Sequence, residues 1–324
     1  MRLLRPIVLA TTLSALLLAC AVIALRPRDT HGSVRPPRTN AIWIGHSWVA
    51  TPPTLSALQG LCTLLHAHNL SEIYVHVGPL DGAGRIPEGR APSAARFTAG
   101  FHAVCPGVRA LAWIGQLLPK WDGLFNLHDE GERAALVRTA VQFTAEGFDG
   151  VQYDLEPVAD GDAAFLDLLR RTRAAIGSGR WLAVAGPALL PTSGLPALPH
   201  LRLPLIPWSS GYYLEVAALT NETDPMLYDT SLRDPAAYSA FVAEQARDLT
   251  LALPGVSLRF GLPAFPGRSA VFDDRVENLS TGLAGVRQGL PNGGGVALYA
   301  LWTMTPAHWS VFGEYSGAAG AGAF

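Results

Sequence analysis

The sequence predicts a single-domain (β/α)8 TIM barrel, preceded by an N-terminal signal or anchor segment, on three observations. Eight short apolar runs follow one another from residue 41 onward, with starts 31 to 44 residues apart. The intervals are long enough for crossover helices, and strands that alternate with helical patterns indicate a parallel sheet. Eight such units within about 260 residues match the usual size of a closed barrel. The runs begin at Ala41, Glu72, Ala110, Gly150, Trp181, Pro225, Ser257 and Val296.

The intervals between the runs carry helix signals. The segment from Asp129 to Glu146 starts with acidic residues, which suit the N-terminus of a helix. Further helices are expected from Glu277 to Gln288 and around Pro306 to Tyr315. An open doubly wound sheet is the rival fold, and it would usually show a glycine-rich phosphate turn after its first strand. The chain has His46-Ser47-Trp48 there, so the closed barrel is favoured.

Composition and charge exclude several classes of protein. Of the 324 residues, 49% are apolar and 15% are charged, so most of the chain is not disordered. The net charge of −2 provides no basic surface, and we expect no nucleic-acid partner. Six arginines against one acid, Asp29, give residues 1–40 a charge of +5 and leave −7 for the remainder. The sequence therefore predicts a basic leader followed by an acidic globular part, which we expect to be monomeric.

Residues 1–25 are expected to be a signal anchor or a lipoprotein signal. The uncharged stretch from Ile7 to Leu25 is nineteen residues long, close to the roughly 20 that a membrane-spanning helix needs. Leu17-Leu18-Ala19-Cys20 resembles a lipobox with Cys20 as the lipidated residue. Either alternative places the rest of the protein outside the cytoplasm, membrane-anchored or secreted. Residues 26–40 are expected to be a linker, 41–316 the barrel, and 317–324 a flexible Gly/Ala tail.

Two cysteines remain beyond the leader. Cys62 and Cys105 stand 43 residues apart; in an exported protein they can form a disulfide, and two buried free thiols are an equal alternative. No Cys/His cluster has the spacing of a zinc site, and the nine histidines are scattered. We therefore expect no metal and no cofactor.

The fourth apolar run, Phe148 to Pro157, carries the candidate chemistry. Side chains alternate faces along a strand, so Gln152, Asp154 and Glu156 share one face, which in a barrel points to the axis. Glu156 then lies at the C-terminal end, where barrel active sites are found. The nearby charge of Asp154 raises the proton affinity of the pair, as a general acid requires. A single acid at a strand end is often only solvated, but three polar residues at a period of two indicate a site.

This run resembles the DGxDxDxE signature of glycoside hydrolase family 18, the chitinases and their relatives. Asp149, Gly150, Asp154 and Glu156 match the signature, and Gln152 stands where the family usually has Asp. The usual Asp shares a proton with the next Asp of the signature. An amide still forms hydrogen bonds but cannot take the charge, so the pH optimum or the substrate could shift.

Further segments agree with the family in order and position. Met226-Leu227-Tyr228-Asp229 resembles its M-x-Y-D on the sixth strand, and Gly261 to Phe265 resembles its G-x-P-x-aromatic seventh strand. Trp302 ends the eighth strand, where the family places a tryptophan under the reacting sugar. The family's Ser-x-Gly-Gly on the third strand is degraded to Trp113-Ile114-Gly115-Gln116.

The resemblance implies a glycosidase, of chitinase or endo-β-N-acetylglucosaminidase type, acting on an oligo- or polysaccharide with β-linked N-acetylglucosamine. The family mechanism is retaining and assisted by the substrate. Glu156 would be the acid and base, Asp154 would orient the 2-acetamido group, and Tyr228 would contact its carbonyl. Trp302 would be an apolar floor. The resemblance also implies substrate-binding positions at Asp149, Gln152, Met226 and Asp229.

A lectin-like barrel that binds carbohydrate without turnover is the alternative function. The family contains such members, and they often lack the acid. Glu156 is present in this chain, which favours the enzyme.

Overall fold

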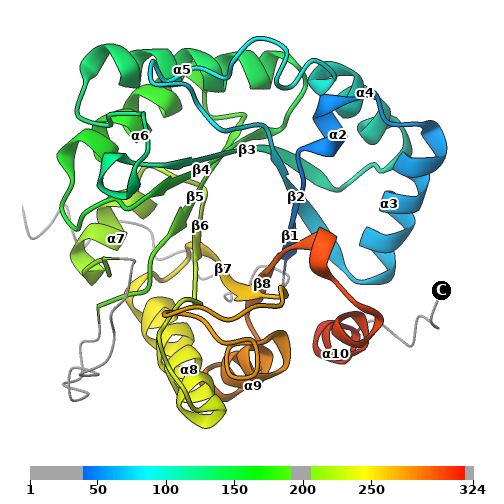
Figure 1. Cartoon of the computed structure of the whole chain (residues 1–324), viewed down its shortest axis with the longest axis vertical. Helices are drawn as coiled ribbons and strands as arrows, with labels where there is room; N and C mark the ends of the chain where they lie inside the picture. Colours follow the sequence, from blue (N-terminus) through cyan, green and yellow to red (C-terminus); the bar gives the residue numbers. More distant parts are fainter. Residues whose placement is uncertain (1–38, 191–205, 318–324) are drawn as a thin grey trace, which may run out of the picture. The chain divides into compact units, whose positions relative to one another are not determined.

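Eight parallel strands close into a barrel in the order β1 to β8, and β8 pairs with β1. The computed structural model describes residues 39–190 and 206–317, all within the compact unit Arg38–Phe324. Figure 1 looks into the barrel, with the strands around the centre and the helices outside them. The predicted (β/α)8 fold class is confirmed. The strands are β1 (Asn40–Ile44), β2 (Leu70–His76), β3 (Arg109–Leu117), β4 (Gly150–Glu156), β5 (Trp181–Gly186), β6 (Glu222–Pro225), β7 (Ser257–Pro263) and β8 (Gly295–Tyr299).

The helices cover the outer face of the sheet, and several have side-chain caps. Asp129 accepts a hydrogen bond from the backbone N–H of Glu132, so α5 begins one residue after the predicted start. Asn278 caps the next-to-last helix in the same way, through Thr281. The helices are α2 (Ser47–Ala50), α3 (Leu55–Ala67), α4 (Ala94–Val104), α5 (Glu130–Ala145), α6 (Ala163–Ile176), α7 (Ser210–Ala217), α8 (Pro235–Ala252), α9 (Leu279–Gly289) and α10 (Pro306–Ser316), with 3-10 turns η1 (Pro119–Trp121) and η2 (Leu301–Thr303).

The sixth strand lies earlier in the chain than its apolar run. Glu222, Thr223 and Asp224 form β6 and are fully buried, whereas the predicted strand began at Pro225, where β6 ends. Met226 makes only an isolated bridge with Gly261 of β7. An apolar run does not mark this strand, because it carries Glu222 and Asp224, whose buried carboxyl groups have partners across the barrel interior.

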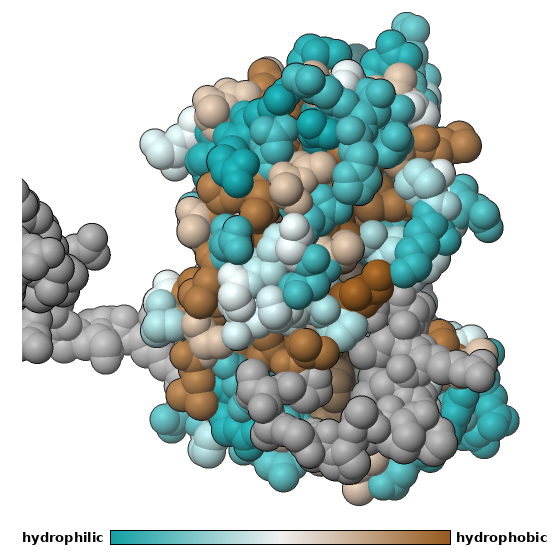
Figure 2. Space-filling view, turned by 90° about the vertical axis from the view of Figure 1, so that its left-hand side faces the viewer, coloured by the Kyte–Doolittle hydropathy of each residue, from teal (hydrophilic) through white to brown (hydrophobic). Residues whose placement is uncertain are grey.

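The hydrophobic core lies mainly between the sheet and the helices. Val151, Tyr153 and Leu155 of β4 belong to this core, as their alternation with the polar residues predicts. The outer surface of the helices is more polar. Figure 2 shows a mainly hydrophilic surface in the upper part of the view, over α5 and α6, with apolar groups scattered among polar ones. On this side of the barrel the helices are therefore apolar toward the sheet and mainly polar toward solvent.

Cys62 of α3 and Cys105, which follows α4, form a disulfide with a Cα–Cα distance of 5.3 Å. Of the two alternatives, a disulfide and two free thiols, the structure shows the disulfide. The ring nitrogens of His66 lie 3.9 Å from the two sulfurs, and the three side chains together form a group of metal-ligating type. The sequence offered no sign of this group, because α3 and α4 bring it together. Sulfurs that are bonded to each other do not act as thiolate ligands.

The expected leader lies outside the described residues. This holds for residues 1–25 with Cys20, for the linker up to residue 38, and for the tail from residue 318. Within residues 39–190 and 206–317, no helix has the length and apolar character needed to cross a membrane.

Candidate active site

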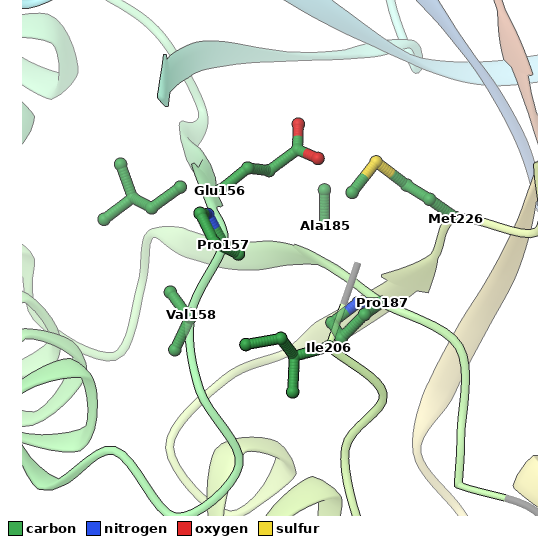
Figure 3. A pocket seen from close by; sticks show the side chains of 8 residues that line it. Glu156, Pro157, Val158, Ala185, Pro187, Ile206 and Met226 are labelled. Carbon is green, nitrogen blue, oxygen red and sulfur yellow. The ribbon is translucent and has the colours of Figure 1, made fainter. Parts of the chain in front are cut away.

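Strand β4 places its three polar side chains toward the barrel interior. Gln152 is fully buried, Asp154 is 7% exposed, and Glu156 ends the strand. Because β4 is hydrogen-bonded to β3 on one side and β5 on the other, its position in the barrel is fixed. Glu156 lines a small hollow together with Met226, which follows β6. In Figure 3 these two side chains extend toward each other above Ala185. The remaining lining residues are Leu155, Pro157, Val158, Ala185, Pro187 and Ile206.

Asp154 and Glu156 form a coupled acid pair. The indole N–H of Trp113 donates to Asp154 Oδ2 at 2.9 Å, whereas Asp154 Oδ1 is buried and receives no N–H or O–H from any described residue. Glu156 lies two residues further along the same face of β4. Burial raises the pKa of Asp154 to about 6, against the hydrogen bonds from Trp113 and Glu156. Burial and the negative charge of Asp154 hold the pKa of Glu156 well above its usual range.

The pair therefore has the electrostatics of an acid and its partner. Two neighbouring carboxyls in a buried site cannot both ionise at low cost, so one proton stays between them near neutral pH. Glu156 is the outer member and the one with access to the hollow, and it keeps the proton. Asp154 is anchored by Trp113 and ionises first.

Two tyrosines close the other side of the pair. Tyr228, after β6, and Tyr299, at the end of β8, stack with ring centroids 5.8 Å apart. Burial raises the pKa of Tyr299 to about 12, and the charges of Asp154 and Glu156 contribute. Burial and the same carboxyls hold the pKa of Tyr228 well above its usual range. Both phenols therefore stay protonated, as hydrogen-bond donors, at any physiological pH.

Asp229 and Trp302 lie at the edge of this group. Asp229 adopts a left-handed backbone conformation with φ of 58°, and its charge raises the pKa of Glu156. Trp302, in η2 after β8, is 54% exposed and meets the Tyr299 ring edge-on at 5.6 Å. An exposed indole beside a buried acid pair provides a flat apolar surface for a ligand. A second hollow begins next to it, lined by Phe265, Asp274, Thr303 and His308, among others.

Asp149 is not brought together with these residues. It precedes β4, at the end of the strand opposite to Glu156, and its Oδ2 accepts the backbone N–H of Ala110 at 2.8 Å. His102 lies 3.5 Å from the same carboxylate. Its contacts are those of a residue that fixes the start of β4 against β3. The signature match at Asp149 therefore has a structural explanation.

A buried polar network lies below the acid pair, and the sequence reasoning missed most of it. The indole N–H of Trp43 donates to Gln152 Oε1 at 2.9 Å, and Gln152 Nε2 donates to Asp224 Oδ2 at 2.6 Å. The network continues through Tyr74 to the fully buried Arg259. In the sequence, the residues of this network are marked only as polar or aromatic residues at alternate positions of β1, β2, β6 and β7. That signal becomes specific only once the strands are assembled.

Comparison with known proteins identifies a fold. No family model matches the sequence, and no curated protein does so either. Solved structures do match. The barrel resembles those of chitinases. The chitinase from Chromobacterium violaceum aligns with a TM-score of 0.59 at 15% identity, over 86% of this chain and 98% of that one. The class V chitinase from Nicotiana tobaccum aligns with a TM-score of 0.56 at 13% identity, over 88% and 99%.

A bacterial spore enzyme has the same fold. The spore cortex-lytic enzyme SleL from Bacillus cereus aligns with a TM-score of 0.57 at 12% identity, over 86% of this chain and 74% of that one. At these identities the similarity establishes the barrel fold and not the activity.

Proposed function

We propose that this protein is a glycoside hydrolase that cleaves glycans containing β-linked N-acetylglucosamine. The observation that carries the proposal is the Asp154–Glu156 pair at the C-terminal end of β4, with Asp154 buried, Glu156 half-buried, a raised pKa at Glu156 and a hydrogen bond from Trp113 to Asp154. A carboxyl that keeps its proton near neutral pH is what the cleavage of a glycosidic bond requires. The similarity in fold to chitinases and to SleL supports a glycan as the substrate.

The proposed reaction is retaining and uses the acetamido group of the substrate. Glu156 gives its proton to the glycosidic oxygen as the C1–O bond breaks, and the acetamido carbonyl oxygen forms a bond to C1. Water then attacks C1, Glu156 takes a proton from that water, and the C1–oxygen bond of the ring intermediate breaks. Two inversions at C1 give net retention. Most glycosidases use a second carboxylate as nucleophile, and substrate assistance is the exception.

The neighbouring residues support this assignment. Asp154, once ionised, accepts the acetamido N–H and turns the carbonyl toward C1. The Tyr228 hydroxyl, which stays protonated because its pKa is raised, donates to that carbonyl. Met226 bounds the hollow from the side of β6. Trp302 offers its exposed ring to the apolar face of a sugar, and Asp229 adds negative charge where positive charge develops on C1.

The same proposal places the protein outside the cytoplasm, held at a membrane through residues 1–25. The Cys62–Cys105 disulfide supports this location, because disulfides persist in oxidising compartments. The leader supports it by its sequence alone. Replacement of Cys20 by Ser distinguishes the two modes of attachment. Loss of lipid label and membrane retention indicates a lipoprotein, and unchanged retention indicates a signal anchor.

The test is incubation with a panel of N-acetylated and non-acetylated glycans, with release of reducing ends as the readout. We expect cleavage of N-acetylated substrates only and inhibition by a thiazoline that mimics the cyclic intermediate. Glu156→Gln is expected to lower kcat by about 1,000-fold or more, within the upper range for loss of a general acid, while the fold is retained. Cleavage confined to non-acetylated glycans rejects substrate assistance. Saturable binding without any release of reducing ends indicates the lectin-like alternative.

A further inference from the structure

The orientation of the Gln152 amide is determined by Trp43. An indole N–H is only a donor, so the atom it contacts at 2.9 Å must be the amide oxygen. The amide nitrogen of Gln152 then faces Asp224, with Nε2 at 2.6 Å from Oδ2. Asp224 Oδ2 is therefore an acceptor, and this leaves Oδ1 as the atom that decides the protonation state.

The hydrogen bonds around the Tyr74 hydroxyl require one proton more than the phenol itself supplies. The Tyr74 hydroxyl lies 2.8 Å from Glu222 Oε1 and 3.1 Å from Asp224 Oδ1, and it accepts from Arg259 Nη1 at 3.1 Å. A phenol has a single proton and can donate to only one of the two carboxyls. The shorter contact, to Glu222, takes it. The contact to Asp224 is then a hydrogen bond only if Asp224 itself carries a proton on Oδ1.

The charge balance of the barrel interior also favours a protonated Asp224. Arg259 contacts both Glu72 and Glu222, and Arg109 Nε lies 2.5 Å from Glu72 Oε2. Two cations thus neutralise two carboxylates. Asp224 is 0% exposed and forms no ion pair with any residue that the structure describes. An unpaired buried carboxylate is costly, and neutralisation by a proton relieves that cost.

The groups that face Asp224 from other strands and helices also favour its protonated form. Burial, together with the negative charges of Glu72 of β2 and Asp154 of β4, holds the pKa of Asp224 well above its usual range, against the hydrogen bond from Gln152. From α7, Tyr213 lies close enough that a charge on Asp224 raises its pKa.

We propose that Asp224 is a neutral carboxylic acid at physiological pH and the positioning residue beneath the catalytic pair. It holds Gln152 through Oδ2 and donates to Tyr74 through Oδ1. The inference of a positioning role rests on the proposed hydrolase function; the inference of a bound proton does not. The family that this chain resembles usually has a proton-sharing Asp at the position of Gln152. In this chain that position on β4 carries an amide, and the carboxyl that bears the proton is Asp224 on β6. Because Asp224 is neutral, it adds no charge under Asp154, which can then ionise while Glu156 keeps its proton.

Infrared spectroscopy of the full chain tests the protonation directly and needs no substrate. Asp224→Asn keeps an acceptor for Gln152 and a donor for Tyr74, so the fold is expected to survive. At pH 7 the difference spectrum between the native protein and this variant is expected to show loss of one carboxylic-acid C=O band. Glu156→Gln is the matched control, and it is expected to remove a different band of the same type. Loss of a carboxylate band in Asp224→Asn overturns the proposal.

Kinetics separates a positioning role from simple filling of space. Asp224→Leu keeps the branched shape but neither hydrogen bond, so kcat is expected to fall about tenfold below that of Asp224→Asn, with KM changed less than about twofold. Equal kcat values for the two variants indicate packing alone and contradict the positioning role. The acid limb of the kcat/KM profile is expected to stay in place in Asp224→Asn. An ionised Asp224 raises the pKa of Asp154, so a shift of that limb to lower pH also contradicts the proposal.

Exchange of the two groups provides a rescue. Gln152→Asp alone removes the N–H donor that faces Asp224 Oδ2 and leaves two acceptors there, and we expect a lower thermal unfolding midpoint and about tenfold lower kcat. The double variant Gln152→Asp/Asp224→Asn restores a donor–acceptor pair between the two positions but gives up the donor to Tyr74. It is therefore expected to recover part of both losses, a coupling that independent sites do not show. Additive losses overturn the proposal. If no variant and no native protein hydrolyses any glycan, the proposed function fails, and the infrared and unfolding results still decide the state of Asp224.

Discussion

The indole N–H of Trp113 donates to Asp154 Oδ2 at 2.9 Å, and both groups are buried beside Glu156. This contact joins β3 to β4, and it lowers the pKa of Asp154 because an N–H donor stabilises the charged carboxylate more than the neutral acid. In the resemblance to family 18, Trp113 occupies a degraded motif on the third strand. The structure gives that position a defined part in the electrostatics of the acid pair.

Removal of this donor is expected to raise the pKa of Asp154. A hydrogen bond to a charged group contributes about 1.5–3 kcal/mol, which corresponds to roughly 1–2 pH units. Trp113→Phe should therefore move the acid limb of the kcat/KM profile to higher pH by about that amount. The control is Trp208→Phe, which removes a buried indole that donates to the carbonyl of Val158. Equal profiles for the two variants would rule out the electrostatic role of Trp113.

The pH dependence of hydrolysis should be bell-shaped. Burial raises the pKa of Asp154 to about 6, so kcat/KM is expected to fall as the pH drops through about 6 and Asp154 takes up a proton. The alkaline limb reports loss of the proton from Glu156. Asp154→Asn is expected to abolish the acid limb and to lower kcat by about 100-fold. The alkaline limb is expected to move to lower pH, because the charge of Asp154 no longer raises the pKa of Glu156. Asp167→Asn, at a surface ion pair with Arg171, serves as control. Persistence of the acid limb in Asp154→Asn would assign it to another group.

Trp302 is expected to contribute to substrate binding and not to stability. Its side chain is 54% exposed, so Trp302→Ala should shift the thermal unfolding midpoint little. An aromatic contact contributes about 1 kcal/mol, so KM should rise about fivefold with a smaller change in kcat. Leu251→Ala, at an exposed apolar side chain of α8, is the control. An unchanged KM would show that no sugar stacks on Trp302.

The disulfide is expected to stabilise the barrel on the side of α3 and α4. Cys62 and Cys105 are 43 residues apart, and the chain-entropy relation for a loop of this length gives about 4 kcal/mol. Denaturant unfolding with and without a reductant measures the difference in free energy of unfolding. The Cys62→Ser/Cys105→Ser variant should be less stable than the oxidised protein and insensitive to reductant. Equal stability of the oxidised and reduced native protein would contradict this expectation.

Local patterns along the chain were sufficient to predict much of the fold. Alternation within β4 placed Gln152, Asp154 and Glu156 on one face because a strand has a period of two, and eight apolar runs predicted eight strands. Apolar runs did not predict the position of β6, because buried Glu222 and Asp224 stand there in place of apolar residues. Burial there depends on partners from β2 and β7, which no local pattern contains.

The sequence by itself determined the barrel and the strand that carries the acid pair, because both follow from periodicities of a few residues. Only the tertiary structure decided which groups surround that pair. It brought Trp113 and Tyr299 to Asp154 and Glu156, set Asp149 at the opposite end of β4, and paired Cys62 with Cys105. These relationships join residues that are distant along the chain, and pKa values and hydrogen bonds depend on distance in space.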